Sequence, residues 1–338
     1  FYQNALYMHG WSQFKQERYR ASIKSFTETL DNLIPPSNDL DELDRGEKEL
    51  ATDSLRVLAV VFSYEQGEET IASVYQSLGE RYYSPLLYSE LAELYLSQER
   101  YRDSADTFKA YAQRYPTSYE AHEFHYRSIQ AYEKGGFSME VIAEKESYVT
   151  RYAVNGNYWL MVDDATREKL GSELKRYLGE LAKYYHALAQ TSADDGDESA
   201  AITFYGSAGS YYLAYINSFP NDPQLAHMTF MLAESLYEAR EYRSAIDAYE
   251  RVAYLYSDFN KAADAGYTAI TSYENLLSGD KEADQWVERE KISSELQFAN
   301  YFPNDSRAPK VVANASQSLF ELSEYEQASS AAKTLTVW

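Results

Sequence analysis

The chain has 338 residues, of which 45% are hydrophobic, and its 53 acidic and 31 basic side chains give a formal net charge of −22. This hydrophobic content excludes a chain that is disordered throughout, and the negative charge argues against binding to nucleic acid or anionic lipid, because both depend on clustered cations. The chain has no cysteine, which excludes disulfides, thiolate metal sites and cysteine nucleophiles. The absence of cysteine fits a bacterial envelope compartment and a reduced cytosol equally well.

The two ends of the chain resemble cut points. The opening FYQNALYMHG contains no initiator methionine and lacks the basic region and apolar core of a signal peptide. The last residue, Trp338, falls within a developing periodic segment. We therefore expect a piece of a longer protein. No apolar run reaches the roughly 18–20 residues that a membrane-spanning helix needs, so we predict no direct membrane insertion by this segment.

One phrase occurs three times along the chain, beginning at Glu17, Glu99 and Arg240. In each copy a tyrosine is followed three positions on by a small residue, and four positions beyond that by an aromatic residue. These positions are Tyr19, Ser22 and Phe26, then Tyr101, Ser104 and Phe108, and finally Tyr242, Ala245 and Tyr249. Offsets of three and four trace one face of an α-helix. A second amphipathic stretch precedes each tyrosine, so the predicted unit is a helical hairpin.

This register resembles the tetratricopeptide repeat (TPR). The best matches to the family positions are Ala92, Tyr95, Tyr101, Ser104, Phe108 and Pro116, followed by Ala233, Leu236, Tyr242, Ala245 and Tyr249. The helix-ending segments YPTSYEA and FPNDPQLA resemble bacterial envelope TPR lipoproteins of the BamD type. The resemblance implies an all-α, right-handed superhelical solenoid of about seven to eight hairpins, one of them enlarged.

Applied along the chain, the repeat predicts a single solenoid over residues 1–338. The predicted units are 1–34, 50–80, 84–116, 118–153, 164–220, 224–258, 261–303 and 307–338, with an acidic loop at 35–49.

The fifth unit departs from the usual spacing of about 34–36 residues. Ser128 and Ala233 occupy equivalent positions and lie 105 positions apart. Leucines and tyrosines at a spacing of three to four predict one long helix over Asp164–Thr191, and a second follows from about Glu198 to Phe219. Two hypotheses stay open for this enlarged hairpin: a family-specific decoration, or a docking arm or self-association surface over 164–219.

Catalysis is not predicted. The segment AHEFH at Ala121–His125 is one residue shorter than the H-E-x-x-H motif of metalloproteases. The acidic run at Asp194–Glu198 lacks the spaced ligands of a calcium loop, and neither a phosphate-binding glycine loop nor a G-x-S-x-G motif occurs. We predict no catalytic residues, no cofactor and no metal site. A metal-binding or enzymatic protein that uses a face with His122 and His125 remains the second alternative.

In the TPR family the first helices of successive units line a concave surface that takes extended peptides or partner helices. Carried onto this sequence, the resemblance implies a groove containing Tyr7, Met8, Trp11, Glu90, Glu93, His122, His125, Tyr126, Tyr132, His227, Phe230, Met231, Glu234, Tyr237, Tyr267, Tyr273 and Asn314. This set is aromatic and acidic, so we expect a protein or peptide partner with basic or apolar side chains. It lacks the Lys/Arg clamp that carboxylate-capturing TPR proteins use for acidic peptide tails.

These observations favour a non-catalytic scaffold or adaptor in a bacterial envelope, periplasmic or tethered to the outer membrane in the full-length protein. The alternative is a cytosolic TPR regulator or co-chaperone, for which a full-length sequence without a signal or lipid-attachment motif would be the discriminating observation.

Overall fold

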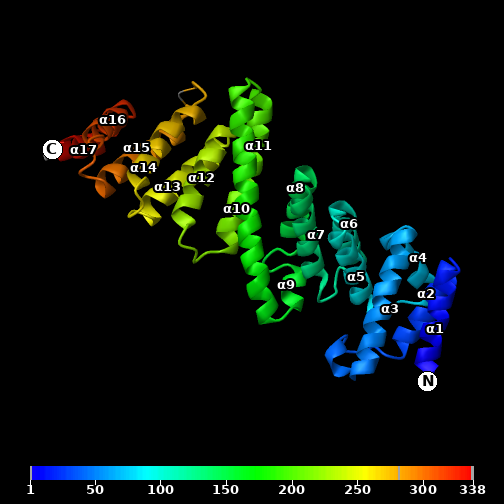
Figure 1. The fold of residues 1–338 in the computed structure, drawn as a ribbon. Helices are drawn as coiled ribbons and strands as arrows, with labels where there is room; N and C mark the ends of the chain where they lie inside the picture. The colour runs from blue at the N-terminus through cyan, green and yellow to red at the C-terminus, as the bar shows by residue number, and fades with distance from the viewer. Residues whose placement is uncertain (1, 281, 336–338) are drawn as a thin grey trace. The chain divides into compact units, whose positions relative to one another are not determined.

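The computed structural model describes residues 2–280 and 282–335, and within those ranges the regular elements are all helices (Figure 1). The chain divides into two compact units, Phe1–Leu170 and Gly171–Trp338. The predicted all-α repeat fold is confirmed for the described residues. The division into one solenoid with eight repeats stays a prediction.

Helices of the first unit are α1 (Tyr2–Lys15), α2 (Tyr19–Asp31), α3 (Arg45–Tyr64), α4 (Glu68–Leu78), α5 (Ser84–Ser97), α6 (Tyr101–Arg114), α7 (Ala121–Gly135), α8 (Ser138–Arg151) and α9 (Asn157–Met161), with a 3₁₀ turn η1 (Leu40–Glu42). A long helix, α10 (Asp164–Asp194), begins in the first unit and continues into the second. The second unit adds α11 (Glu198–Ser218), α12 (Leu225–Glu238), α13 (Tyr242–Leu255), α14 (Ala262–Ser272), η2 (Tyr273–Leu276), α15 (Gln285–Tyr301), α16 (Ala308–Glu321) and α17 (Tyr325–Thr334).

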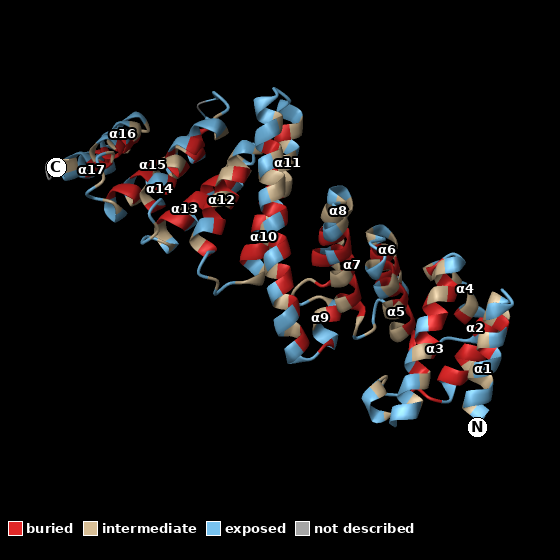
Figure 2. Ribbon diagram, viewed as in Figure 1, coloured by how far each residue is buried: buried red, intermediate tan, exposed pale blue. Residues whose placement is uncertain are grey.

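Small residues lie where helices approach most closely. Ser104 and Ala245 are fully buried, as are the aromatic residues four positions later in their helices. A Cβ atom added at Gly10 would lie 3.0 Å from the ring of Phe26, so α1 and α2 approach closely there. Figure 2 shows the buried residues concentrated on the faces where helices meet, with exposed residues on the opposite faces. The repeated phrase therefore encodes helix packing.

The turn inside several hairpins contains a residue in the left-handed region. Glu17, Glu99, Arg240 and Ser323 have φ between 57° and 65°, and each precedes the first tyrosine of the next helix by two positions. Such a residue ends the first helix by reversing the chain direction. For a residue with a Cβ atom this conformation costs about 1 kcal/mol, which the packing of both helices offsets.

The structure modifies two local expectations. The predicted acidic loop 35–49 contains η1, and α3 already begins at Arg45. Asp44 makes this early start favourable, because its side chain accepts a hydrogen bond from the backbone N–H of Glu47 at 2.8 Å and so caps the helix. The short helix α9 was not predicted.

Among the described residues, no helix combines the length and apolar character needed to cross a bilayer.

Candidate partner-binding surfaces

Side chains on α1 and α3 meet around one carboxylate. The hydroxyl of Tyr7 donates to Asp53 Oδ2 at 2.5 Å, and Trp11 Nε1 donates to the same oxygen at 3.3 Å. On the same helix, Arg56 Nε donates to Asp53 Oδ1 at 3.1 Å. Burial alone would raise the pKa of Asp53, but the hydrogen bonds from Tyr7 and Arg56 outweigh it and hold the pKa below its usual value. Asp53 is therefore ionised and fixes two aromatic side chains in place.

Side chains on α5 and α7 make a second set of contacts. Arg127 Nη1 donates to Ser89 Oγ at 3.2 Å, and the same guanidinium forms an ion pair with Glu93. Glu90, in contrast, has no hydrogen bond or ion pair from its side chain among the described residues. Burial raises the pKa of Glu90, and the charge of Arg56 only partly offsets this effect. Glu90 is a half-buried carboxyl group without a partner.

We call these contacts together the first-helix face, because they join the first helices α1, α3, α5 and α7 of the hairpins in the first unit. Its residues are Tyr7, Trp11, Asp53, Arg56, Ser89, Glu90, Glu93 and Arg127. We add the half-buried Tyr126, which lies next to Arg127 on α7. A recess of about 710 Å³ beside Asp53 and Arg56 adjoins this face, between η1 and α3.

The predicted groove residues fall into three groups. Buried residues are His122, His125, Tyr132, Phe230 and Tyr273. Half-buried residues are Tyr7, Trp11, Glu90, Tyr126, Met231, Glu234, Tyr237 and Tyr267, and exposed residues are Met8, Glu93, His227 and Asn314. The buried group packs inside the units and has too little accessible surface to contact a partner. The groove hypothesis therefore applies to the other two groups, for which it stays a prediction.

The two histidines of AHEFH engage different partners. His125 Nε2 lies 3.1 Å from Glu144 Oε2 on α8, and burial lowers the pKa of His125 despite this carboxylate. His122 Nδ1 lies 3.2 Å from the carbonyl oxygen of Tyr119 and 3.1 Å from the hydroxyl of Tyr158 on α9. Within the described residues, no group of three or more His, Cys, Asp or Glu side chains is placed to hold a metal ion. Packing against these neighbouring residues explains the positions of both imidazole rings.

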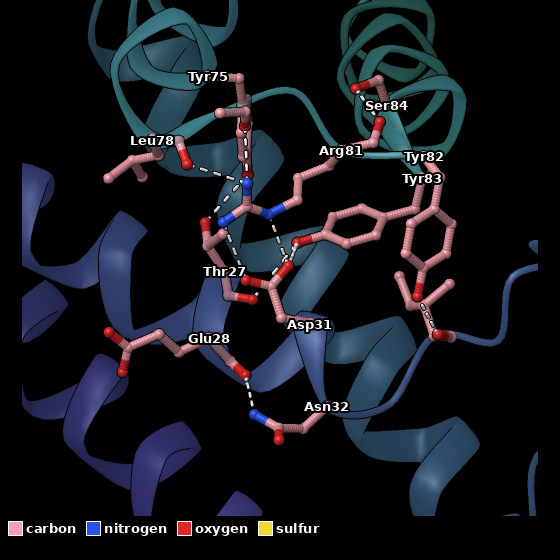
Figure 3. Close-up of polar contacts among 12 residues, drawn as sticks. Thr27, Glu28, Asp31, Asn32, Tyr75, Leu78, Arg81, Tyr82, Tyr83 and Ser84 are labelled. Carbon is pink, nitrogen blue, oxygen red and sulfur yellow. Dashed lines mark hydrogen bonds and ion pairs between the residues drawn. The ribbon is translucent and has the colours of Figure 1, made fainter.

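A polar cluster that the sequence did not indicate joins α2 to α4 and to the segment between α4 and α5 (Figure 3). Arg81 holds Asp31 through two hydrogen bonds, from Nε to Oδ1 at 2.7 Å and from Nη2 to Oδ2 at 3.0 Å. The hydroxyl of Tyr83 donates to Asp31 Oδ1 at 2.7 Å, and that of Tyr75 lies 3.0 Å from Thr27 Oγ1. We call these five residues the Arg81 cluster. Its polar groups satisfy one another, which indicates a structural role.

In the second unit, several predicted groove residues pair with their neighbours. The hydroxyl of Tyr249 on α13 donates to Glu234 Oε1 at 2.5 Å. Lys261 lies over the ring of Phe230, with its Nζ atom 4.5 Å from the ring centre. Arg307 lies in the same way over Tyr267, at 4.9 Å. The first contact fixes side chains within one hairpin, and the other two fix them between consecutive hairpins.

Comparison with known proteins identifies the repeat. Two segments match the tetratricopeptide repeat, residues 89–136 and residues 229–258. They coincide with the two copies of the phrase in which the register is clearest. No curated protein sequence matches the chain.

Several solved structures are similar to the chain. The TPR domain of P58(IPK) is 14% identical, with 94% of this chain and 79% of that chain covered and a TM-score of 0.26. A circular tandem repeat protein is 14% identical over 99% of this chain and 88% of its own, with a TM-score of 0.34. Yeast Tom70 is 12% identical over 99% and 91% of the two chains, with a TM-score of 0.23.

The resemblance to the BamD type receives no support from these comparisons. The family matches at 89–136 and 229–258, together with the all-helical repeat arrangement of the described residues, show that the chain contains tetratricopeptide repeats.

Proposed function

We propose that the chain is a non-catalytic protein–protein interaction scaffold whose first-helix face binds a basic or apolar segment of a partner protein. Tetratricopeptide repeats are typical of such scaffolds and generally do not catalyse reactions. The observation that carries the proposal is the half-buried, unpartnered carboxyl group of Glu90, on a face where the neighbouring charges are paired.

The chemistry of the face favours a cationic occupant. Asp53 and Glu93 already have partners in Arg56 and Arg127, so they add little net attraction for a ligand. Burial disfavours the charged form of Glu90, and a lysine or arginine side chain placed beside it would recover the lost solvation. Aromatic rings supply contact area at a low cost in side-chain entropy, and Tyr7, Trp11 and Tyr126 provide it here. Apolar side chains of the partner would pack on these rings.

The cellular location is part of the proposal. We infer a bacterial envelope protein, periplasmic or tethered to the outer membrane, from the YPTS phrase, and the absence of cysteine is compatible with this location. A cytosolic regulator or co-chaperone is the alternative. Fractionation of cells that express the full-length protein distinguishes the two: recovery with the envelope supports the proposal, and recovery in the cytosol supports the alternative.

The partner-binding proposal is tested with Glu90→Gln, which removes the charge and keeps the shape. We expect several-fold weaker capture of partner proteins from an extract of the native cell, read by quantitative mass spectrometry. The matched control is Glu326→Gln, which removes an exposed carboxylate on α17. Unchanged capture by the Glu90 variant, or an equal loss in both variants, would contradict the proposal.

A further inference from the structure

A pocket of about 370 Å³ opens in the second unit, where the tip of the enlarged hairpin meets the turn between α12 and α13. Its polar and aromatic lining residues are Glu198, Tyr205, Tyr237, Glu238, Arg240 and Tyr242. We call it the Tyr205 pocket. Neither the repeat register nor the first-helix face accounts for it.

Tyr205 is the most unusual residue of this lining. Its side chain is only 8% exposed, and its ring packs edge-on against that of His186, with the ring centres 5.4 Å apart. Among the described residues, the Tyr205 hydroxyl has no hydrogen-bond partner. Although the ring is buried, the hydroxyl itself reaches the accessible space of the pocket. The pocket therefore contains a polar group that a ligand would satisfy.

The electrostatic balance around that hydroxyl is negative. Burial raises the pKa of Tyr205, and the carboxylates of Glu238, Asp194 and Glu234 raise it further, which places three negative charges close to the hydroxyl. The only cation among the lining residues of the pocket that the structure describes is Arg240, and it already forms an ion pair with Glu198. A ligand entering this pocket meets more carboxylates than cations.

Two further tyrosines line the Tyr205 pocket. The rings of Tyr237 and Tyr242 pack edge to face, with centres 5.5 Å apart and planes at 69°. Tyr237 is half-buried and Glu238, the next residue, is exposed. The Glu238 side chain has no ion pair or hydrogen bond within the described part of the chain. Aromatic faces beside unpaired carboxylates attract organic cations, because the ring quadrupole and the carboxylate charge act together.

We propose that the Tyr205 pocket is a second docking site, which takes the guanidinium or ammonium group of an arginine or lysine side chain on a partner protein. The N–H groups of the cation donate to the Tyr205 hydroxyl oxygen and to Glu238, and the cation lies against the ring face of Tyr237. The proposal rests on the proposed scaffold function for the source of the cation. It also gives the enlarged hairpin a role, because the tip of that hairpin supplies one wall of the pocket.

The pocket is tested by fluorescence anisotropy with a fluorescein-labelled peptide of four Gly-Arg repeats, at about 150 mM salt so that diffuse attraction is screened. A peptide with citrulline in place of arginine keeps the shape and removes the charge. We expect the arginine peptide to bind the full chain and the citrulline peptide to bind at least tenfold more weakly. Equal affinity of the two peptides would overturn the proposal.

Substitutions in the pocket test whether the arginine peptide binds there. Tyr237→Leu and Glu238→Gln should each weaken binding of the arginine peptide by about three- to tenfold, in line with the strength of cation–π and charged contacts. Tyr237→Phe keeps the ring and should retain affinity within about twofold. Glu326→Gln, which removes the same charge elsewhere in the unit, should have no effect. Equal weakening by Glu238→Gln and Glu326→Gln would overturn the proposal.

The experiments distinguish a failure of the pocket proposal from a failure of the scaffold proposal. If the pocket variants lose the peptide while Glu90→Gln leaves partner capture unchanged, the pocket proposal holds and the first-helix face is not the partner site. If Glu90→Gln reduces capture while the pocket variants bind the peptide as well as the unmodified chain does, the pocket proposal is overturned and the scaffold proposal holds.

Discussion

The Arg81 cluster of the first unit and the Tyr205 pocket of the second contain similar kinds of side chain. They differ in whether the polar groups of those side chains have hydrogen-bond partners. Each combines tyrosines and at least one carboxyl group with one arginine. In the cluster, Arg81 and Tyr83 both donate to Asp31, so donors and acceptors are matched. In the pocket, among the described residues, the Tyr205 hydroxyl and the Glu238 side chain have no hydrogen-bond partner. Matched groups stabilise the fold, and unmatched groups beside a cavity are available to a ligand.

A third site shows that an unmatched group alone does not make a binding site. Glu295 on α15 is only 2% exposed, and within the described part of the chain its Oε2 atom has no hydrogen-bond partner. Burial raises the pKa of Glu295 to about 7, although the charge of Lys291 opposes the shift. Glu295 is almost completely buried on α15, so we expect it to affect stability rather than binding.

The largest effect is expected from Asp31→Ala. It removes the acceptor of the buried Tyr83 hydroxyl and one of several acceptors of the Arg81 guanidinium, and we expect a loss of about 1–3 kcal/mol in the free energy of unfolding, measured by urea denaturation. Asp103→Ala is the matched control, because Asp103 forms an exposed pair with Arg100 and should cost less than about 1 kcal/mol. Similar small losses in both variants would show that the cluster is not a structural centre.

An intermediate effect with a defined pH dependence is expected from Glu295→Gln. The raised pKa means that the folded chain binds this proton more tightly than the unfolded chain, so this group destabilises the fold as the pH rises from about 4.5 to about 7. The variant should be more stable than the unmodified chain by about 1–2 kcal/mol at pH 8 and equal to it near pH 4.5. A difference that does not vary with pH would show that Glu295 is not protonated in the folded chain.

The smallest effect on stability is expected from Glu238→Gln. Because Glu238 is exposed and, within the described residues, unpaired, the free energy of unfolding should change by less than about 0.5 kcal/mol. Together with the loss of peptide binding, this result would separate the pocket from the Arg81 cluster by two independent measurements. A loss of more than about 1 kcal/mol would instead place Glu238 among the structural residues.

Local periodicity explains what the sequence predicted well. The spacing of Tyr101, Ser104 and Phe108 depends only on helix geometry, so it located a buried helix face without knowledge of the neighbouring helices. The long helix of the enlarged hairpin followed from the same reasoning, and α10 ends three residues beyond its predicted last residue.

The features that the sequence did not predict depend on contacts between segments that lie far apart along the chain. Arg81 and Asp31 are separated by 50 positions, and nothing in the register pairs them. The Tyr205 pocket depends on how the tip of one hairpin meets the turn of the next. The family positions also placed His122 and His125 in the groove, whereas His125 packs against Glu144 on α8 and His122 against Tyr158 on α9. A pattern along one helix does not specify which neighbour each of its faces meets.

Site-specific photo-crosslinking in cells tests the scaffold function most directly. A benzoylphenylalanine replaces either Tyr126 on α7, within the first-helix face, or Met139 on α8 of the same hairpin, whose side chain is 75% exposed. We predict that the Tyr126 position crosslinks to a basic or apolar segment of a partner protein, identified by mass spectrometry, and that the Met139 position does not. Equal crosslinking from both positions, or crosslinking from Met139 alone, would contradict the account.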